Sequence, residues 1–559
     1  MTDTRIGVFV CHCGRNIGGY VDVPAAVEYA KGLPDVAYAE HNLYTCSEDG
    51  ISSIKRKIQE HNLNRVVVAS CTPRTHESLF RSACQEAGLN KYLFEFVNIR
   101  DQCSWVHMKL PKEATEKAKA LIRMGVAKAR LLEPLEEIEI EVIPSCLVIG
   151  GGVAGMTAAL NLANQGLDVH LVEKEAELGG LVLNLHKLFT SNKDAGELVD
   201  PFINQVRNHK RITTHLSTKV KDVRGFIGNF DVTLDHGEEE TTLSVGTIIV
   251  AVGAQEFKPV GQYGYGEVAA VLTQLELEER MKEGTVEAKN VVMINCVGAR
   301  LPERPYCSRF CCLTAIKNAV LIKENDPEAN VWLLHRDLMA YGVEFEDYYR
   351  KAMELGVRFV RYSVESPPEV IKNGTLESVR VYHHLMGKQL ELPSDMVVLT
   401  TPLVPRSENP AISKMLKVPL SSEGFFLEAH LKLQPVEFAT DGIYICGSAR
   451  WPVEASEAIF QAYAASAKAA APLRRGYVRP EAITSSVDED ACGGCGICVA
   501  MCPYGAMEMK TENGGRTAHA ITALCKGCGT CGAACPAGAI SMSHFKDAQI
   551  MAQIEALVA

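Results

Sequence analysis

The first 140 residues alternate short apolar, β-branched runs with longer amphipathic stretches. Apolar residues that recur every three to four positions indicate helices, whereas compact β-branched runs bounded by turn residues indicate strands. The pattern predicts strands at 6–10, 37–44 and 65–69 and helices at 24–31, 51–61 and 75–87. Strands that alternate with helices are typical of parallel sheets, so a small parallel α/β domain is predicted.

The rest of the chain divides into further parts. A charged helix is predicted over 112–132, and the acidic, proline-containing stretch that follows has the composition of a linker. A strand at Cys146 then opens a large α/β region. We expect domains at 1–140, 141–480 and 487–542, with a closing helix at 543–559.

The closing helix carries an apolar face formed by Ile550, Ile554 and Leu557. Such a face needs a cover in the folded protein. We expect it to pack on the module at 487–542, with docking on a partner as the alternative.

The composition is that of a compact protein without a nucleic-acid-binding face. Of 559 residues, 47% are hydrophobic and 22% are charged, and the net charge is −11. No secretory signal and no apolar run of membrane-spanning length is found. The twenty cysteines are therefore expected to be reduced or metal-bound in the cytoplasm.

Eight cysteines near the C-terminus form two runs with the same spacing. Cys492-x-x-Cys495-x-x-Cys498-x-x-x-Cys502-Pro recurs 33 residues later as Cys525-x-x-Cys528-x-x-Cys531-x-x-x-Cys535-Pro. This is the ligand pattern of a bacterial two-cluster ferredoxin, in which the fourth cysteine of each run ligates the other cluster. One cube is expected to take Cys492, Cys495, Cys498 and Cys535, and the other Cys525, Cys528, Cys531 and Cys502. Two structural zinc sites are the alternative, but zinc motifs usually pair two-cysteine knuckles.

A dinucleotide site is predicted where the strand at Cys146 meets the next helix. Gly150 permits a tight turn, Gly152 lets the backbone approach a pyrophosphate, and Gly155 permits close packing of helix on strand. A strand is predicted at 168–172, and Glu173 follows it at the position where an acid holds ribose hydroxyls, which leaves FAD or NAD. A Rossmann remnant without nucleotide is the alternative.

Two later segments favour FAD. The runs that end in Gly253-Ala254 and Gly447-Ser448 resemble motifs of two-dinucleotide-domain flavoproteins, in which aspartate is usual at the position of Ser448. The second glycine-rich motif, which would bind a nicotinamide, is replaced by Asn295-Cys296-Val-Gly298. The residues expected to bind FAD are Gly150, Gly152, Val153, Ala154, Gly155, Glu173, Lys174, Gly180, Val220, Gly253, Ala254, Gly447 and Ser448.

Four further cysteines lie close together in the middle of the chain. Cys296 follows a predicted strand, and Cys307, Cys311 and Cys312 come within the next sixteen residues. Four thiolates at one strand end suit another metal site, because ligands gather at the carboxyl edge of open α/β sheets. The alternative is that the four pack as small buried hydrophobic residues.

These motifs resemble those of the A-type iron–sulfur flavoprotein of heterodisulfide reductase. The resemblance lies in Asn295-Cys-Val-Gly-Ala-Arg300, Pro305-Tyr-Cys-Ser-Arg-Phe-Cys-Cys312, Cys11-His-Cys-Gly14 and Ser70-Cys-Thr-Pro-Arg-Thr-His-Glu77. It implies a thioredoxin-reductase-like FAD core that lacks a redox dithiol, and a [4Fe–4S] cluster on the four mid-chain cysteines, the third in the chain. Longer members carry an inserted ferredoxin domain near 228–247 that is absent here.

The resemblance also implies what this chain does. We expect an oxidoreductase component that bifurcates or merges electrons among a two-electron donor, ferredoxin and a disulfide-type acceptor. Its partners would be other heterodisulfide-reductase-like subunits, a module that oxidises hydrogen, formate or NADH, and ferredoxin, assembled as a dimer of hetero-oligomers. No side chain is expected to act as acid or base. The alternatives are a protein for electron relay and assembly, or a self-sufficient NAD(P)H-dependent reductase.

The N-terminal cysteines leave two interpretations open. Cys11 and Cys13 follow the first predicted strand, Cys46 the second and Cys71 the third. In a parallel sheet all four would lie at the carboxyl edge. They could bind a further cluster or form a redox-active group, or they could be free thiols of a packing and docking domain.

Overall fold

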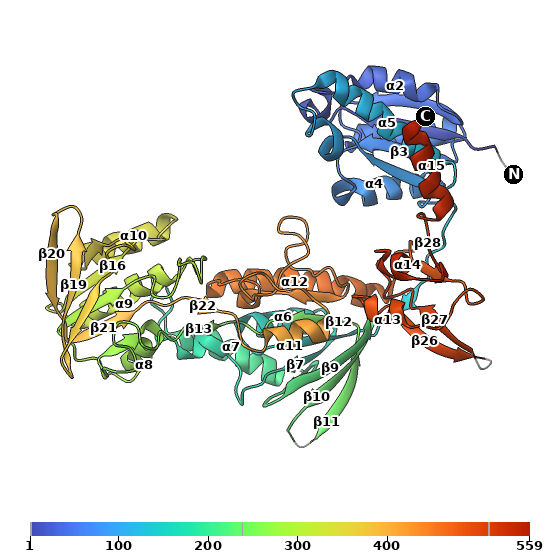
Figure 1. Ribbon diagram of the computed structural model, residues 1–559. Coiled ribbons are helices and arrows are strands. Elements are labelled where there is room, and N and C mark those ends of the chain that lie inside the picture. Colours follow the sequence, from blue (N-terminus) through green and yellow to red (C-terminus); the bar gives the residue numbers. More distant parts are fainter. Residues whose placement is uncertain (1–2, 190, 238, 513–514) are drawn as a thin grey trace. The chain divides into compact units, whose positions relative to one another are not determined.

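The computed structural model describes residues 3–189, 191–237, 239–512 and 515–559. Its internal contacts divide the chain into two compact units (Figure 1). The first unit joins Met1–Ile138 to Arg479–Ala559, and the second is Glu139–Val478.

A four-stranded parallel sheet forms the centre of the N-terminal part of the first unit. Its order is β2-β1-β3-β4, with β1 (Ile6–Cys11), β2 (Val36–Asn42), β3 (Arg65–Ser70) and β4 (Phe94–Asn98). The sequence pattern predicts the first three strands but not β4, because Glu95 interrupts its apolar run. Glu95 is tolerated inside the fold because Nζ of Lys128 pairs with its carboxylate at 3.0 Å.

The longer helices beside this sheet are α2 (Val23–Lys31), α3 (Glu48–Glu60), α4 (Pro73–Glu86) and α5 (Pro111–Ala129), and the short α1 (Arg15–Gly18) follows β1. Side-chain caps determine where two of them begin. Asp22 accepts a hydrogen bond from the backbone N–H of Ala25 at 3.0 Å, and Ser47 accepts one from Gly50 at 3.2 Å. The predicted starts at 24 and 51 are slightly late because the apolar periodicity begins after the capped first turn.

The C-terminal cysteine-rich module consists of two pairs of strands and two short helices. The antiparallel pairs are β25 (Ser485–Val487) with β28 (Ile540–Met542) and β26 (Met507–Glu512) with β27 (Gly515–Ala520). The helices α13 (Ile497–Met501) and α14 (Thr530–Ala534) each carry the third cysteine of one run.

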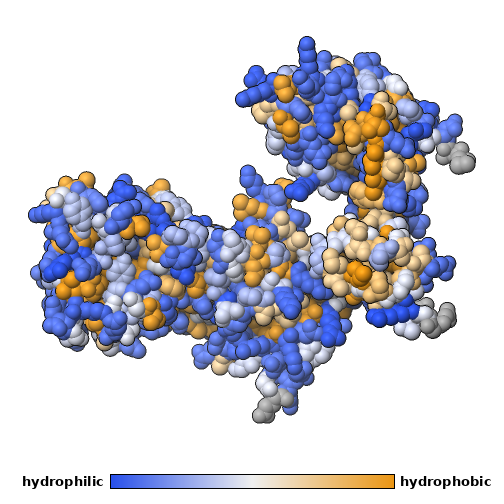
Figure 2. Space-filling view, viewed as in Figure 1, coloured by the Kyte–Doolittle hydropathy of each residue, from blue (hydrophilic) through white to orange (hydrophobic). Residues whose placement is uncertain are grey.

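The sequence led us to expect that the closing helix α15 (Asp547–Val558) would pack on the cysteine-rich module, but it does not. It lies along α5 of the N-terminal part (Figure 1). Nε2 of Gln549 donates to the carbonyl of Leu131 at 2.9 Å, and Nε of Arg123 donates to the carbonyl of Ala556 at 2.5 Å. Apolar surface remains along the helix, where Ile554 is about half exposed (Figure 2).

The first sheet of the second unit is a five-stranded parallel sheet with the order β23-β12-β6-β7-β8. Its strands are β6 (Ser145–Ile149), β7 (Asp168–Val172), β8 (Ile212–His215), β12 (Thr247–Val250) and β23 (Ile443–Ile445). The helices α6 (Val153–Asn164) and α12 (Ala455–Arg475) pack on one another, since the buried alanines of α12 allow close approach. The predicted strand at 168–172 matches β7.

A three-stranded antiparallel sheet, β11-β10-β9, adjoins this core through β9 (Lys219–Phe226), β10 (Asn229–Asp235) and β11 (Glu240–Val245). It occupies the segment near 228–247 where longer chains with the same motifs are expected to carry their insertion. The helices α7 (Ala195–Asn208) and α11 (Asn409–Leu416) complete this half of the unit.

The second sheet of this unit is also parallel, with the order β14-β21-β15-β16-β17. Its strands are β14 (Val271–Thr273), β15 (Asn290–Ile294), β16 (Asn330–His335), β17 (Arg358–Arg361) and β21 (Met396–Leu399). The accompanying helices are α8 (Gln274–Lys282), α9 (Cys311–Asn325) and α10 (Val343–Glu354). A small antiparallel sheet is formed by β18 (Glu369–Lys372), β19 (Leu376–His383) and β20 (Lys388–Pro393). Among the described residues, no helix has the length and apolar character needed to cross a membrane.

Candidate functional site

The predicted glycine turn has the geometry of a phosphate-binding loop. Gly150 has φ of 110°, and a Cβ there would lie 2.4 Å from the carbonyl oxygen of Ala251. A Cβ at Gly155 would lie 1.8 Å from the carbonyl oxygen of Gly150. At Gly152, directly before α6, the nearest atom to an added Cβ is 4.0 Å away. Backbone segments therefore pass close to one another at Gly150 and Gly155, while the space at Gly152 leaves the N-terminus of α6 open to a ligand.

Glu173 lies at the end of β7, beside this turn. Its two carboxylate oxygens accept hydrogen bonds from the backbone N–H groups of Gly151 at 2.6 Å and Glu175 at 2.9 Å. These bonds hold the acid where a ribose would lie in a dinucleotide site. The neighbouring Lys174 pairs with Glu408 at 2.6 Å, and this hydrogen bond lowers the pKa of Glu408 to about 2.

The turn opens into a cavity of about 750 Å³ in the second unit. Of the residues predicted to bind FAD, the cavity is lined by Gly150, Gly152, Val153, Ala154, Glu173, Lys174, Gly180, Val220, Gly253, Ala254 and Ser448. Gly155 lies beneath the turn, and the N–H of Gly447 donates to Oε1 of Gln461 at 3.0 Å. The open helix N-terminus, the acid and the space that the glycines leave fit an FAD molecule.

A buried ion pair in the wall of this cavity has no counterpart in the sequence predictions. Nζ of Lys317 lies 2.7 Å from the carboxylate of Glu278, with side chains 2% and 0% exposed. Lys317 also donates to the carbonyl of Lys187 at 2.7 Å. Burial lowers the pKa of Lys317, and the charge of Glu278 opposes this effect. The sequence did contain a signal for this pair, since Lys317 and Asn318 interrupt the apolar run of α9. Polar residues that are buried in such a run need partners.

The four mid-chain cysteines come together at the carboxyl edge of the second sheet. Cys296 follows β15 with φ of 63°, and Cys311 and Cys312 open α9. The pKa of Cys311 is raised by its hydrogen bond with Cys312, by burial, and by the thiolates of Cys312, Cys307 and Cys296. All four sulfurs therefore lie within electrostatic reach, and Cys311 also lines the cavity.

The surroundings of these thiols fit a bound iron–sulfur group. A hydrogen bond from Cys311 and a further one from the fully buried side chain of Asn295 lower the pKa of the Cys312 thiol. The backbone N–H of Arg309 donates to Sγ of Cys307 at 3.3 Å. Thiolate is the form of cysteine that binds iron, so donors that stabilise the thiolates of Cys307 and Cys312 suit a bound iron–sulfur group.

One cysteine of the first C-terminal run, Cys502, interacts with the second run, while the exchange of ligands between the two runs stays a prediction. Burial, Cys525 and, more weakly, Cys502 raise the pKa of Cys531, which places a cysteine of the first run beside the second. Burial, Cys492 and Cys495 raise the pKa of Cys498. The thiols also accept backbone N–H bonds, from Ala518 to Cys492, from Ala506 to Cys502 and from Ser485 to Cys525.

Glycines support the bends between these thiols. Gly494 has φ of 68°, and a Cβ there would lie 2.5 Å from the carbonyl oxygen of Arg516. Gly527 occupies the equivalent position in the second run, with φ of 62° and 2.5 Å to the carbonyl oxygen of Ile483. Among the described residues, no three His, Cys, Asp or Glu side chains converge as ligands of a single ion. Each thiolate of a cube binds a different iron, so such convergence is not required.

The N-terminal cysteines also gather at one edge, as the parallel sheet requires. Sγ of Cys11 accepts hydrogen bonds from the N–H groups of Cys13 at 3.2 Å and Thr45 at 3.3 Å. Burial and the thiolates of Cys11 and Cys13 raise the pKa of Cys46. Burial also raises the pKa of Cys71, and the charge of Arg100 opposes that effect.

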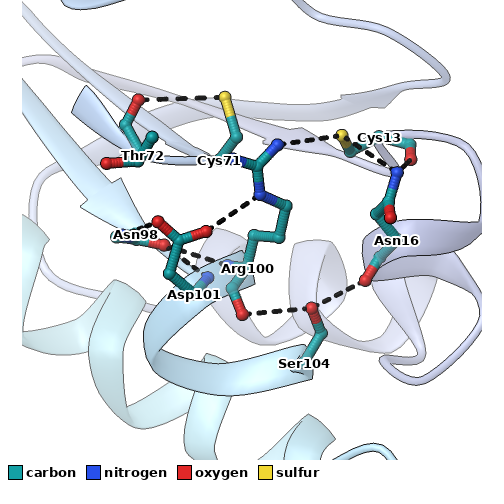
Figure 3. A network of polar contacts seen from close by, with 8 residues as sticks. All are labelled: Cys13, Asn16, Cys71, Thr72, Asn98, Arg100, Asp101 and Ser104. Carbon is teal, nitrogen blue, oxygen red and sulfur yellow. Dashed lines mark hydrogen bonds and ion pairs between the residues drawn. The ribbon is translucent and has the colours of Figure 1, made fainter. Parts of the chain in front are cut away.

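Arg100 lies between two of these thiols and was not predicted from the sequence. Figure 3 shows its guanidinium between Cys13 and Cys71, with Nη1 3.9 Å from Sγ of Cys13 and Nε 2.9 Å from Asp101. It begins a one-turn π-helix, Arg100–Ser104, a feature frequent at functional sites. The positive charge of Arg100 stabilises thiolates nearby, and thiolates are needed both to bind an iron–sulfur cluster and to react as nucleophiles.

Family models match both the second unit and the C-terminal module. The model for pyridine nucleotide-disulphide oxidoreductases matches residues 144–469, and that for the 4Fe-4S dicluster domain matches residues 491–549. The first match confirms the predicted flavoprotein-type α/β core, and the second confirms the two-cluster module that follows it.

Curated relatives extend along the whole chain. A CoB–CoM heterodisulfide reductase iron–sulfur protein of the A type from Methanopyrus kandleri is 40% identical over 658 residues, covering 100% of this chain and 98% of the relative. This chain belongs to the HdrA family, the A-type iron–sulfur flavoproteins of heterodisulfide reductase. It is an oxidoreductase component. Since the alignment runs over 658 residues and the chain has 559, the relative is longer, as expected of a family that includes forms with an insertion.

Other known proteins are similar to this HdrA family member. The A-type component of the H(2):CoB-CoM heterodisulfide,ferredoxin reductase of Methanothermobacter marburgensis is 40% identical over 650 residues, covering 100% of this chain and 98% of that protein. A solved thioredoxin reductase from Lactococcus lactis aligns with a TM-score of 0.43 and 17% identity, covering 60% of this chain and 100% of its own.

Proposed function

We propose that this chain is the electron-bifurcating component of a heterodisulfide-reductase-like complex. Two electrons from one donor would be divided, one passing to a low-potential ferredoxin and the other toward a disulfide-type acceptor, or the reverse. The observation that carries the proposal is that Cys311 belongs to the mid-chain cysteine site and also lines the FAD-sized cavity. An electron carrier bound there would lie beside the flavin.

The proposed cofactors are one FAD and three [4Fe–4S] clusters. FAD converts between two-electron and one-electron chemistry, while clusters carry single electrons. The predicted residues that line the cavity would hold FAD, with Gly155 and Gly447 supporting the loops. Cys296, Cys307, Cys311 and Cys312 would hold the third cluster, and the eight C-terminal cysteines the other two.

The protein contributes positions and charges rather than acid–base chemistry. The wall beside Cys311 holds the paired Lys317 and Glu278, which places a cation and an anion at fixed points in a dry site. Preorganised charges of this kind stabilise a chosen charge state of a bound group. We infer that the pair sets the flavin potential and takes no proton from a substrate.

The names of the relatives support part of the proposed set of partners. Three relatives are named as heterodisulfide,ferredoxin reductases, two with hydrogen and one with hydrogen or formate in the name. We infer for this chain other heterodisulfide-reductase-like subunits, ferredoxin and a module that oxidises hydrogen, formate or NADH, assembled as a dimer of hetero-oligomers.

The test is a measurement of the two one-electron potentials of the flavin in the holoprotein. Bifurcation requires crossed potentials, in which the second electron leaves at a much lower potential than the first. Potentials in the ordinary order would instead indicate a protein for electron relay and assembly. Full bleaching of the flavin in the isolated chain by NADH or NADPH would indicate a self-sufficient reductase.

A further inference from the structure

A hydrogen-bonded path connects the mid-chain cysteine loop with the loop that closes the FAD cavity. The backbone N–H of Arg309 donates to Sγ of Cys307 at 3.3 Å. Its guanidinium donates to both carboxylate oxygens of Glu457, at 3.2 and 3.0 Å. Glu457 also accepts from Nε2 of Gln461 at 3.2 Å, and Oε1 of Gln461 accepts the N–H of Gly447 at 3.0 Å. Consecutive hydrogen bonds therefore run from a thiol to the flavin loop.

The ion pair in this path is poorly suited to a purely stabilising role. The side chains of Arg309 and Glu457 are 40% and 37% exposed, and pairs at such exposure contribute little to stability. Arg309 also has φ of 68°, a left-handed conformation that is unfavourable for a residue with a Cβ. Strained residues of this kind cluster at functional sites.

A ring contact of Tyr306 with Trp451 joins the same two loops without Arg309, and Tyr306 is also anchored to two neighbouring segments. The ring of Tyr306 lies 5.2 Å from that of Trp451 and 5.6 Å from that of Phe425, measured between centroids. The hydroxyl of Tyr306 donates to the carbonyl of Leu403 at 2.9 Å. Loss of the Arg309 side chain should therefore interrupt the path while the loops remain packed.

We propose that Arg309 is a positioning residue that couples the mid-chain cysteine site to the flavin-binding loop through Glu457 and Gln461. The inference rests on the proposed function, because it takes Cys307 as a cluster ligand and Gly447 as part of the flavin loop. Cys307, as a ligand of iron, would keep its sulfur, and with it the N–H of Arg309, in one place. The guanidinium then orders Glu457 and Gln461, so that FAD meets a loop already held in its binding conformation. By reciprocity, bound FAD favours the iron-loaded cysteine site to the same degree.

The test is a double-mutant cycle read out as the Kd for FAD of deflavinated, full-length protein. Cys307→Ala alone and Arg309→Gln alone should each raise the Kd about fivefold or more, the lower end of typical coupling between sites. The two changes together should raise it no further than either alone, because both interrupt one path. Arg309→Lys keeps the charge beside Glu457 and should restore part of the affinity.

The matched control is an ion pair of equal exposure in the same unit. Lys351 pairs with Glu324 at 2.6 Å with side chains 42% and 38% exposed, and Lys351→Gln should leave the Kd for FAD unchanged. Additive effects of Cys307→Ala and Arg309→Gln, or an equal effect of Lys351→Gln, would overturn the coupling.

Iron counting separates this inference from the proposed function. If Cys307→Ala loses about four irons but its effect on FAD is additive with that of Arg309→Gln, the coupling alone is wrong. If Cys307→Ala loses no iron, the cluster assignment and the coupling are both wrong. Should Arg309→Gln fail to fold, Glu457→Gln removes the charge from the same path. Combined with Cys307→Ala, it should then raise the Kd for FAD no further than either change alone.

Discussion

At the scale of single residues, the cavity depends on glycines that leave space and on a buried ion pair in its wall. The open surroundings of Gly152 are available to a ligand, whereas Gly150 and Gly155 are needed by the fold itself. Lys317 and Glu278 are almost fully enclosed, so each depends on the other for compensation of its charge. These two features lead to separable predictions for binding and for stability.

Gly152→Ala should weaken FAD binding without unfolding the protein. Its Cβ would meet no protein atom closer than 4.0 Å but would occupy space where the pyrophosphate approaches the backbone. We expect the Kd for FAD to rise about tenfold, equivalent to ~1.4 kcal/mol, with an unchanged unfolding midpoint of the FAD-free protein. An unchanged Kd would show that the phosphates do not lie at this turn.

Lys317→Met should lower the free energy of unfolding by about 3–5 kcal/mol, because it leaves the buried carboxylate of Glu278 without a compensating cation. The double variant Lys317→Met/Glu278→Leu should recover most of this loss, since two apolar side chains leave no charge uncompensated. Urea titration of both variants is the measurement. Lys351→Met, which breaks an exposed pair, is the control and should cost less than about 1 kcal/mol. Equal losses in Lys317→Met and the control would contradict the burial argument.

At the scale of elements, local pattern predicted the first three strands and the main helices of the N-terminal part but not where the closing helix packs. The strands at 6–10, 65–69 and 168–172 were recognised because compact apolar runs are a local signal. The strand β4 was missed because Glu95 is compensated by Lys128, 33 positions away. The apolar face of α15 gave no indication that α5 would cover it, because amphipathic patterning does not identify the partner element.

Removal of residues 546–559 should destabilise the N-terminal part of the first unit. α5 would lose its contact with α15 and the hydrogen bonds of Arg123 and the carbonyl of Leu131 to that helix. We expect faster amide exchange in α5 and an unchanged Kd for FAD in the truncated chain. If amide exchange in α5 is unchanged, α15 does not stabilise α5 and must pack against another surface, such as that of a partner protein.

The adjoining strands β7 and β8 bring two histidines together, and we expect this pair to make the second unit sensitive to acid. Nδ1 of His170 lies 3.2 Å from Nε2 of His215, and the ring of His236 is 5.9 Å from that of His215. Burial, His170 and His236 lower the pKa of His215 to about 4. The unfolded chain therefore binds more protons than the folded one between pH ~6.5 and ~4, and stability falls as the pH drops through this range.

His215→Gln should reduce this loss of stability. The free energy of unfolding, measured by urea titration at pH 7.5 and pH 5, should fall less in the variant than in the unaltered chain. His209→Gln, which changes a histidine outside this group, is the control and should retain the full loss. The same loss in His215→Gln would show that other groups carry the acid sensitivity.

At the scale of the whole molecule, the candidate centres are distributed over both units. The FAD cavity and the mid-chain cysteines belong to the second unit, and the N-terminal and C-terminal cysteines belong to the first. Motif spacing predicted the glycine turn and the eight C-terminal cysteines because their ligand geometry is local. The pairs Lys317–Glu278 and Arg309–Glu457 could not be predicted in this way, since their members are 39 and 148 positions apart.

The most direct test of the central claim is the iron, sulfide and flavin content of anaerobically purified protein, with the unaltered chain beside Cys311→Ala/Cys312→Ala. Three clusters and one FAD predict at least about twelve irons per flavin, falling by about four in the variant. Any iron beyond twelve would be assigned to Cys11, Cys13, Cys46 and Cys71 and should persist in the variant. An equal iron content in the two proteins would contradict the claim that a cluster lies beside the flavin, and the mid-chain cysteines would then be structural.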